Sequence, residues 1–360
     1  MCIRDRIRNA TKKPIKLGKK QAPFNTLVQP VNNSIKETIK VPEKQAVETI
    51  IKVEEKKAVS DDKNEPTALF KRAKSKYFTQ QITIRLANLN SPLKKQYWNA
   101  YHCSSVLLQM DNEKGENKVT ARYCGTRFCN ICNRIRTAKM MNGYGAQLNK
   151  LENLYFVTLT IKNVSAGYLK PATEQMTANF QKINGCLKHK YKDVHGLRKL
   201  EVTYNPRTNE YHPHFHILID GKEKAEYIKK RWLEMYPNVT DEKGQDIRRA
   251  TRGSYNELFK YTTKIAVKTG KESIVDVKAL DVIFQALQGK RILQPFGKVK
   301  KESENINDED MKNMELKAQK QQIPYYDYMK WVYHKNDWIN HFGEQATGFV
   351  PIKENDLVFR

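Results

Sequence analysis

Residues 211–220 read YHPHFHILID, a stretch in which histidine recurs at every second position between apolar residues. Successive side chains of a β-strand point to opposite faces, so alternation with period two predicts a strand. Phe215, Ile217 and Ile219 would then face a core, and the three histidines His212, His214 and His216 would share the opposite face. The stretch therefore predicts a strand that presents imidazole groups on one side.

A second alternating run, RKLEVTYN at 198–205, precedes this strand, and the turn-rich NPRTNE at 205–210 joins the two as a hairpin. Pairing Asn205 with Glu210 places Glu201 opposite His214, with Cβ atoms about 5 Å apart. Two imidazoles and a carboxylate can bind a divalent metal and leave positions open for a substrate. The alternative is an exposed, histidine-rich face. We predict a metal site of Glu201, His214 and His216, with His212 as a further candidate ligand.

The composition points to a polyanionic partner. The 360 residues include 65 Lys and Arg against 39 Asp and Glu, which gives a formal charge of +26. Such an excess favours nucleic acid as the partner. The sequence contains no apolar run near the ~20 residues of a membrane span and no signal-peptide core, so we expect a cytoplasmic protein without a membrane partner.

Four of the six cysteines lie in a spacing typical of metal binding: Cys103, Cys124, Cys129 and Cys132, the last three within RYCGTRFCNICNRIR at 122–136. Four thiolates suit tetrahedral zinc, and the ion would close a loop with little core of its own. The alternatives are reduced structural cysteines or a redox-active pair. The surrounding basic residues predict contacts with DNA phosphates: Arg127, Arg134, Arg136 and Lys139.

The segment SYNELFKYTTKIAVK at 254–268 has helical periodicity, which places Glu257, Tyr261 and Lys264 on one face. On its own this would be an ordinary solvated helix face. Beside a metal site it gains a chemical meaning, because a phenolate is a competent nucleophile at phosphorus. A metal and a lysine can neutralise the charge that develops on the phosphate.

The order of VTLT at 157–160, HPHFH at 212–216 and ELFKYTTK at 257–264 resembles the three motifs of the HUH endonuclease superfamily. More closely, it is similar to the plasmid rolling-circle replication initiators of the single-tyrosine type. The resemblance extends over roughly 95–300 and includes CGTRFCNIC and the later ALQGKRIL.

The resemblance implies an α+β fold, in which a compact antiparallel sheet carries the histidine pair and flanking helices carry the nucleophile. It implies that His214 and His216 bind Mg²⁺ or Mn²⁺, that Tyr261 is the nucleophile and that Glu257 directs hydrolysis at termination. The expected partners are the double-strand origin, the single-stranded nick site, and a host replicative helicase and polymerase.

The expected organisation has four parts. Residues 1–70 form a disordered basic tether, in which MCIRDR at 1–6 resembles a translated sequencing adapter. Residues 71–150 form a Cys-rich zinc-binding and DNA-contact region, 151–270 the nicking domain, and 271–360 a C-terminal helical region. In the last part, the aromatic PYYDYMKWVYHKNDWINHF at 324–342 either packs back onto the domain or stacks on single-stranded DNA.

Three other functions are alternatives to a replication initiator. In conjugative relaxases the tyrosine precedes the histidine motif, whereas here it follows. An HUH transposase fits the motif order, although ALQGKRIL favours replication. A non-catalytic, zinc-dependent DNA-binding regulator explains the charge and the cysteines but leaves Glu257, His214 and Tyr261 without a purpose.

Overall fold

The computed structural model describes residues 67–111, 117–259, 267–269, 272–301, 328–351 and 357–359. The chain divides into two compact units, Met1–Lys56 and Lys57–Arg360, and all described residues belong to the second. Among the described residues, no helix has both the length and the apolar character that crossing a membrane requires.

The helices are α1 (Ala68–Ala87), α2 (Lys94–Tyr101), α3 (Asn130–Asn149), α4 (Ala166–Lys190), α5 (Lys222–Met235), α6 (Arg252–Phe259) and α7 (Val277–Leu287). The strands are β1 (Val106–Asp111), β2 (Asn117–Ala121), β3 (Leu154–Thr160), β4 (His195–Asn205), β5 (Glu210–Asp220), β6 (Asp246–Arg249), β7 (Val267–Thr269), β8 (Glu272–Val275), β9 (Leu293–Gly297), β10 (Tyr328–Val332), β11 (Asp337–Ile339) and β12 (Leu357–Phe359).

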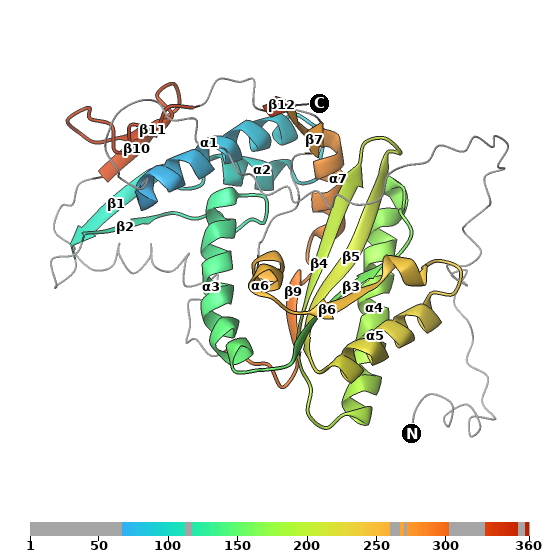
Figure 1. The fold of residues 1–360 in the computed structure, drawn as a ribbon. Coiled ribbons are helices and arrows are strands. Elements are labelled where there is room, and N and C mark those ends of the chain that lie inside the picture. The colour runs from blue at the N-terminus through green and yellow to red at the C-terminus, as the bar shows by residue number, and fades with distance from the viewer. Residues whose placement is uncertain are drawn as a thin grey trace, which may run out of the picture. The chain divides into compact units, whose positions relative to one another are not determined.

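The central sheet has the strand order β6-β3-β5-β4-β9, and every neighbouring pair in it is antiparallel (Figure 1). The β4–β5 hairpin has the predicted register, with Asn205 opposite Glu210 and Glu201 opposite His214. Two smaller sheets have the orders β11-β10-β1-β2 and β12-β8-β7, and only the β12–β8 pair among the described strands is parallel. The predicted α+β class with an antiparallel sheet and flanking helices is confirmed.

One face of the central sheet packs against α4 and α5 (Figure 1). Phe215, Ile217 and Ile219 of β5 are fully buried there, as their alternation predicted. The ring of Phe215 lies 5.6 Å from that of Phe180 on α4 and 5.7 Å from that of Trp232 on α5, both edge to face. This face is the apolar core that fixes the register of the hairpin.

The opposite face carries the histidines and is also covered. Leu218 of β5 packs in one cluster with Leu148 at the end of α3 and with Leu258 and Phe259 of α6. A period of two on β5 places His214 and His216 on this same face. The predicted metal ligands therefore lie beside a second apolar core, to which α3 and α6 contribute, and not on an open sheet surface.

Helix α7 connects the cysteine-rich part of the chain with the central sheet. Asp281 on α7 accepts hydrogen bonds from the hydroxyls of Ser91 and Tyr97, at 2.6 and 2.5 Å. After α7 the chain returns to β4, where the backbone N–H of Leu200 donates to the carbonyl of Ile292 at 2.8 Å. The loop between α7 and β9 is thus held next to β4, close to Glu201.

Two predictions of secondary structure are wrong. The predicted helix over 254–268 is described as α6 up to Phe259, but Val267 and Lys268 lie in strand β7 and not in a helix. The region 271–360 was expected to be helical, but its described part contains α7 and five strands, β8 to β12. The predicted divisions at 150 and 270 both fall within the unit Lys57–Arg360.

The C-terminal aromatic segment packs onto the protein where the structure describes it. Trp331 and Trp338 are buried, with ring centroids 4.7 Å apart, and the indole of Trp338 donates to the carbonyl of Ser104 at 2.8 Å. Tyr333 is exposed and stacks on Tyr101 with an interplanar angle of 11°. The packing interpretation therefore holds for the two tryptophans.

Candidate active site

Glu201, His214 and His216 form a compact group that could hold a metal ion. One ligand atom from each residue lies within 4.8 Å of the other two, and all three residues are at most 8% exposed. The Nε2 atom of His216 is 3.8 Å from a carboxylate oxygen of Glu201. Two imidazole nitrogens and one carboxylate oxygen are a donor set that suits a divalent cation.

The Nδ1 atom of each histidine is engaged outside this group. Nδ1 of His214 lies 3.1 Å from the backbone carbonyl of His212, and Nδ1 of His216 lies 3.3 Å from the hydroxyl of Thr158 on β3. Such contacts fix the orientation of a ligand imidazole and leave Nε2 for the metal. His212 thereby contributes its carbonyl, and its ring stacks on that of His214 with centroids 5.1 Å apart.

The environment keeps His216 neutral. Burial, together with the nearby His214, lowers the pKa of His216 to about 3. A neutral imidazole retains the lone pair that metal binding requires. Burial alone would raise the pKa of Glu201, but Lys199 and the two histidines lower it to about 2, so that this carboxyl is ionised.

Lys199 is a central residue of the site that sequence analysis missed. It is 4% exposed, and its Nζ donates to the carboxylate of Glu201 at 2.7 Å and to the backbone carbonyl of Glu257 at 2.9 Å. The ammonium therefore links Glu201, the candidate ligand on β4, to α6, the helix that carries Glu257. The only signal in the sequence was the position of Lys199 two residues before Glu201, on the same face of the strand.

Glu257 reaches the metal group from α6. One of its carboxylate oxygens lies 3.3 Å from Nε2 of His216, and the other forms an ion pair with Arg248 of β6 at 3.2 Å. Its side chain is 42% exposed, so water can approach it. The structure therefore brings the predicted carboxylate of the helix to the predicted metal ligands.

Tyr261 and Lys264 lie outside the described residues. The nearest described tyrosine on the same segment is Tyr255, whose hydroxyl donates to the carbonyl of Leu148 at 3.3 Å. Burial raises the pKa of Tyr255. Because its ring packs in the core between α3 and α6, Tyr255 is poorly placed to act as a nucleophile.

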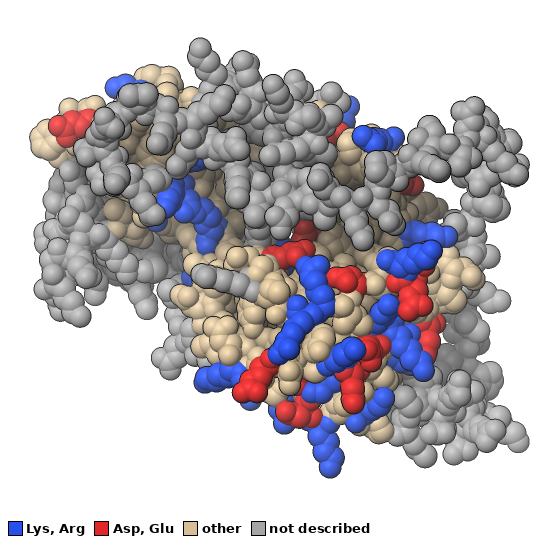
Figure 2. All heavy atoms as spheres, viewed as in Figure 1, with Lys and Arg blue, Asp and Glu red and all other residues tan. Residues whose placement is uncertain are grey.

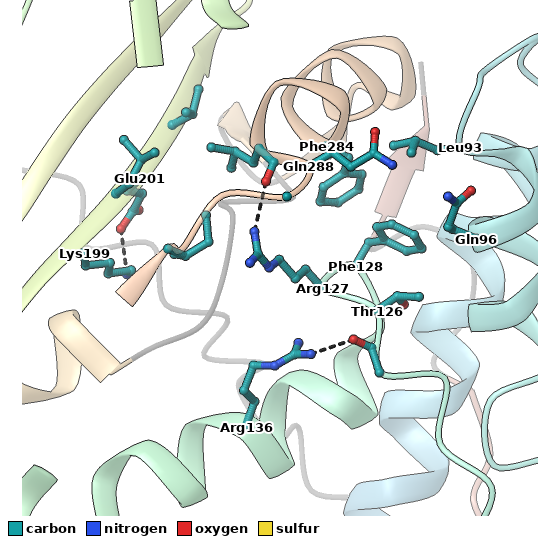
Figure 3. Close-up of a pocket in the computed structure, with 16 residues that line it drawn as sticks. Leu93, Gln96, Thr126, Arg127, Phe128, Arg136, Lys199, Glu201, Phe284 and Gln288 are labelled. Carbon is teal, nitrogen blue, oxygen red and sulfur yellow. Dashed lines mark hydrogen bonds and ion pairs between the residues drawn. The ribbon is translucent and has the colours of Figure 1, made fainter. Parts of the chain in front are cut away.

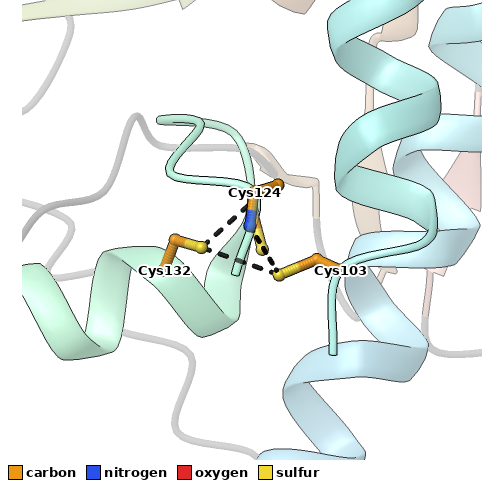
Figure 4. Close-up of side chains that lie close together, drawn as sticks. Cys103, Cys124 and Cys132 are labelled. Carbon is orange, nitrogen blue, oxygen red and sulfur yellow. Dashed lines mark hydrogen bonds between the residues drawn. The ribbon is translucent and has the colours of Figure 1, made fainter. Parts of the chain in front are cut away.

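The four predicted cysteines meet in a second candidate metal centre, and Figure 4 shows three of them, Cys103, Cys124 and Cys132. The sulfur of Cys132 lies 3.6 Å from the sulfurs of both Cys103 and Cys124, and Cys129 belongs to the same group. Tetrahedral zinc with four thiolates places sulfur atoms about 3.8 Å apart, so the spacing fits. Hydrogen bonds from the other thiols lower the pKa of Cys124, whereas burial raises that of Cys129.

The predicted DNA-contacting arginines surround this cluster and bind the protein backbone. Arg127 donates to the carbonyl of Leu287 at 2.9 Å, Arg134 to that of Lys71 at 2.7 Å and Arg136 to that of Gly125 at 2.6 Å. Lys139 lies further along α3 and is partly buried. On the face shown in Figure 2, basic and acidic side chains are interspersed over the region of α5 and β6.

A third group of possible ligands, Asp193, His195 and Asp220, lies at the other end of the central strands. Its carboxylates already have cationic partners, because Asp193 pairs with Lys298 and Asp220 with Lys224. This arrangement is typical of surface ion pairs, and we assign it no metal.

Fold and site together define a protein whose antiparallel sheet carries a candidate divalent-metal centre of two histidines and a glutamate. The family described as Replication protein matches residues 116–340. The chain therefore belongs to this family, which confirms the resemblance to the plasmid replication initiators.

Curated relatives agree with this assignment. The chain is 32% identical over 165 residues to a protein of Staphylococcus aureus named Protein rep, a match that covers 40% of this chain and 70% of that protein. A Protein rep of a Bacillus species is 31% identical over 145 residues, which are 37% of this chain and 47% of that protein. A Protein rep of Streptococcus pneumoniae is 24% identical over 241 residues, which are 59% of this chain and 73% of that protein.

The coverage of these relatives is partial. The chain spans less than half the length of the two Bacillus relatives, 47% and 40%. No solved structure matches the chain.

Proposed function

We propose that this protein initiates rolling-circle replication of a plasmid by nicking one strand of the double-strand origin. The observation that carries the proposal is the group of Glu201, His214 and His216 with the carboxylate of Glu257 3.3 Å from His216. Glu257 lies on α6, the helix that leads directly to Tyr261. A candidate metal site and a tyrosine four residues after Glu257 in the sequence, in a protein of charge +26, suit cleavage of a DNA phosphodiester.

Glu201, His214 and His216 would hold Mg²⁺ or Mn²⁺. Such an ion, when bound, polarises and orients the scissile phosphate. The protein's own residues prepare this site: the His212 carbonyl and Thr158 orient the two imidazoles, and Lys199 holds Glu201 in its ionised form.

In the nicking step, the phenol oxygen of Tyr261 forms a bond to phosphorus while the bond from phosphorus to the 3′ oxygen breaks. The phenol loses its proton, and the departing 3′ oxygen gains one. The products are a 5′-phosphotyrosine link and a free 3′-hydroxyl, which primes a host polymerase behind a host replicative helicase. Lys264 would neutralise charge that develops on the phosphate.

Termination requires a second cleavage at the regenerated origin, and Glu257 would make this cleavage a hydrolysis. A partly exposed carboxylate next to the metal group can act as general base on a water molecule. We expect Glu257→Gln, which keeps the shape but removes the basicity, to leave the first nick near normal. Termination should fall by about 100-fold, the scale of general-base catalysis. Gel analysis of replication products should show multimeric single strands.

Glu257→Tyr is the complementary variant. It should restore a covalent second cleavage if this position reaches the phosphate. An equal loss of initiation and termination in Glu257→Gln would instead assign Glu257 to metal binding or to structure, through its contacts with His216 and Arg248.

The cysteine cluster would hold structural zinc. We expect Cys129→Ser and Cys132→Ser to lose zinc and about 3–5 kcal/mol of unfolding free energy, because the ion closes the loop before α3. Metal analysis and chemical denaturation of the purified protein measure both effects. Cys186→Ser is the matched control, because Cys186 lies on α4 outside the cluster and should keep the zinc. Full stability of purified wild-type protein without zinc would refute this assignment.

A nicking assay tests the proposed function. The substrate is a supercoiled plasmid that carries the DNA flanking the gene, with Mg²⁺ or Mn²⁺ added. Conversion to the open circle with DNA attached to protein supports the initiator. Binding without any metal-dependent nick would indicate a non-catalytic regulator, and cleavage at mobile-element ends in place of an origin would indicate a transposase.

A further inference from the structure

A cavity of about 330 Å³ opens next to the metal group, and nothing in the proposed chemistry uses it (Figure 3). Lys199 and Glu201 line one side of it, and Gln96 of α2 and Leu93, which directly precedes α2, line the opposite side. Arg127 extends between these two sides. The volume lies in the range of pockets for small molecules, about 300–1,000 Å³.

The cavity walls combine flat apolar surface with a few polar groups. Phe128 and Phe284 lie against each other with centroids 5.1 Å apart, and Leu287 and Ile292 extend the apolar lining. Gln96 brings a side-chain amide to this lining. Its Oε1 atom is buried and accepts no hydrogen bond from any residue that the structure describes. A buried carbonyl oxygen without a donor costs free energy that a bound ligand with an N–H group would recover.

The edge of β4 adds further polar groups to the cavity. Strand β9 pairs with β4 only as far as Lys199, which lies opposite Leu293, and Leu200 then donates to Ile292. Polar backbone groups of a strand alternate between its two edges, so those of Val202 point to the same side as those of Leu200. Val202 lines the cavity, and among the described strands none pairs with β4 on that side beyond β9.

We propose that this cavity binds one adenine base of the single-stranded DNA that adjoins the scissile phosphate. A planar base fits between apolar walls, and a glutamine amide can pair with adenine through two hydrogen bonds, accepting one and donating one. Gln96 Oε1 would accept from the amino group of the base. Arg127 and Lys199 both line the cavity, and their positive charge suits the phosphate that connects the base to the metal group.

The position of the cavity favours a base within a DNA strand over a free nucleotide. The cavity shares Lys199 and Glu201 with the metal site, so a strand whose phosphate lies at the metal brings its neighbouring base to the cavity mouth. This inference rests on the proposed function. A cavity that binds a base would give the protein a sequence preference, which a metal site that contacts only a phosphate cannot supply.

Binding of labelled single strands in EDTA tests the inference without cleavage. The probes are short oligomers of deoxyadenylate, of deoxythymidylate and of abasic nucleotides, measured by fluorescence anisotropy on the full chain. We expect wild-type protein to bind the adenine oligomer about tenfold more tightly than the abasic one, the value of one good base contact. Gln96→Leu should remove this preference and leave binding of the thymine oligomer unchanged.

Gln181→Leu is the matched control, since Gln181 is exposed on α4 and does not line this cavity. It should retain the preference for adenine. Equal binding of adenine and abasic oligomers by wild-type protein would overturn the inference without the need for any variant. So would competition by deoxyadenosine monophosphate as effective as that by the oligomer, because the cavity would then serve a free nucleotide.

The inference and the proposed function can fail separately. Normal metal-dependent nicking with no preference for adenine would overturn the cavity assignment alone. A preference that depends on Gln96, in a protein that nicks no origin DNA, would overturn the proposed nicking alone.

Discussion

Replacing Tyr261 with Phe should abolish both nicking and the covalent DNA adduct while leaving origin binding largely intact. The substitution removes only the phenol oxygen, which we propose as the nucleophile, so the rate of cleavage should fall by about 10⁴-fold or more. Gel analysis of supercoiled DNA and of labelled oligonucleotides measures nicking and adduct formation, and a mobility-shift assay measures binding.

Tyr255→Phe is the control for this prediction, because it makes the same chemical change on the same segment. The hydroxyl of Tyr255 donates to the carbonyl of Leu148 within a packed core, so its loss should cost some stability but no chemistry. If Tyr255→Phe abolished the adduct and Tyr261→Phe did not, the assignment of the nucleophile would be wrong.

Removing either histidine of the metal group should have a similarly large effect. We expect His214→Ala or His216→Ala to eliminate cleavage, since each would supply one of the two imidazole nitrogens of the proposed metal site. Chelation by EDTA should also stop wild-type cleavage, and added Mg²⁺ or Mn²⁺ should restore it. Nicking at the wild-type rate in EDTA would contradict a role for metal in the reaction.

His212→Ala should be milder. His212 orients His214 through its backbone carbonyl, which alanine retains. The substitution therefore removes only the stacked ring. Cleavage by His212→Ala should therefore remain within about tenfold of wild type. A ring that contacts a metal ligand affects how well the site binds metal, but it does not itself coordinate the ion. A complete loss of cleavage would make His212 a ligand itself.

The hairpin register was predictable because sequence and topology leave few choices. A four-residue loop between Asn205 and Glu210 fixes which residues face each other, and a slip by one residue would turn Phe215 to the wrong face. For this reason the pairing of Glu201 with His214 follows from the amino-acid sequence alone. The meeting of Cys103 with the three later cysteines depends on tertiary packing, so the sequence could support it only as a hypothesis.

Lys199 could not be assigned from the sequence. A lysine on the polar face of a strand is ordinarily solvated, and here it is buried because α6 returns over the sheet and offers it the carbonyl of Glu257. The cavity at Gln96 likewise forms only where α2, the loop before α3, α7 and β4 pack together. No local sequence pattern predicts the burial of Lys199 or the cavity at Gln96, since each depends on segments far apart in the chain.

The missed strand β9 has a different cause. It contains Pro295, which lacks a backbone N–H and argues against a central strand, but β9 lies at the sheet edge where proline is tolerated. Its last residue, Gly297, has φ +71°, and a Cβ atom there would lie 1.9 Å from the carbonyl oxygen of Val194. The close approach of two chain segments requires glycine at that position, and the sequence alone does not show that approach.

The most direct test of the account is to identify the residue that carries DNA after cleavage. Wild-type protein is reacted with a single-stranded oligonucleotide that contains the nick site, in the presence of Mn²⁺, and the digested adduct is sequenced by mass spectrometry. We expect a 5′-phosphate ester on Tyr261 and none on Tyr255. An adduct on any other residue, or metal-dependent cleavage with no adduct at all, would contradict it.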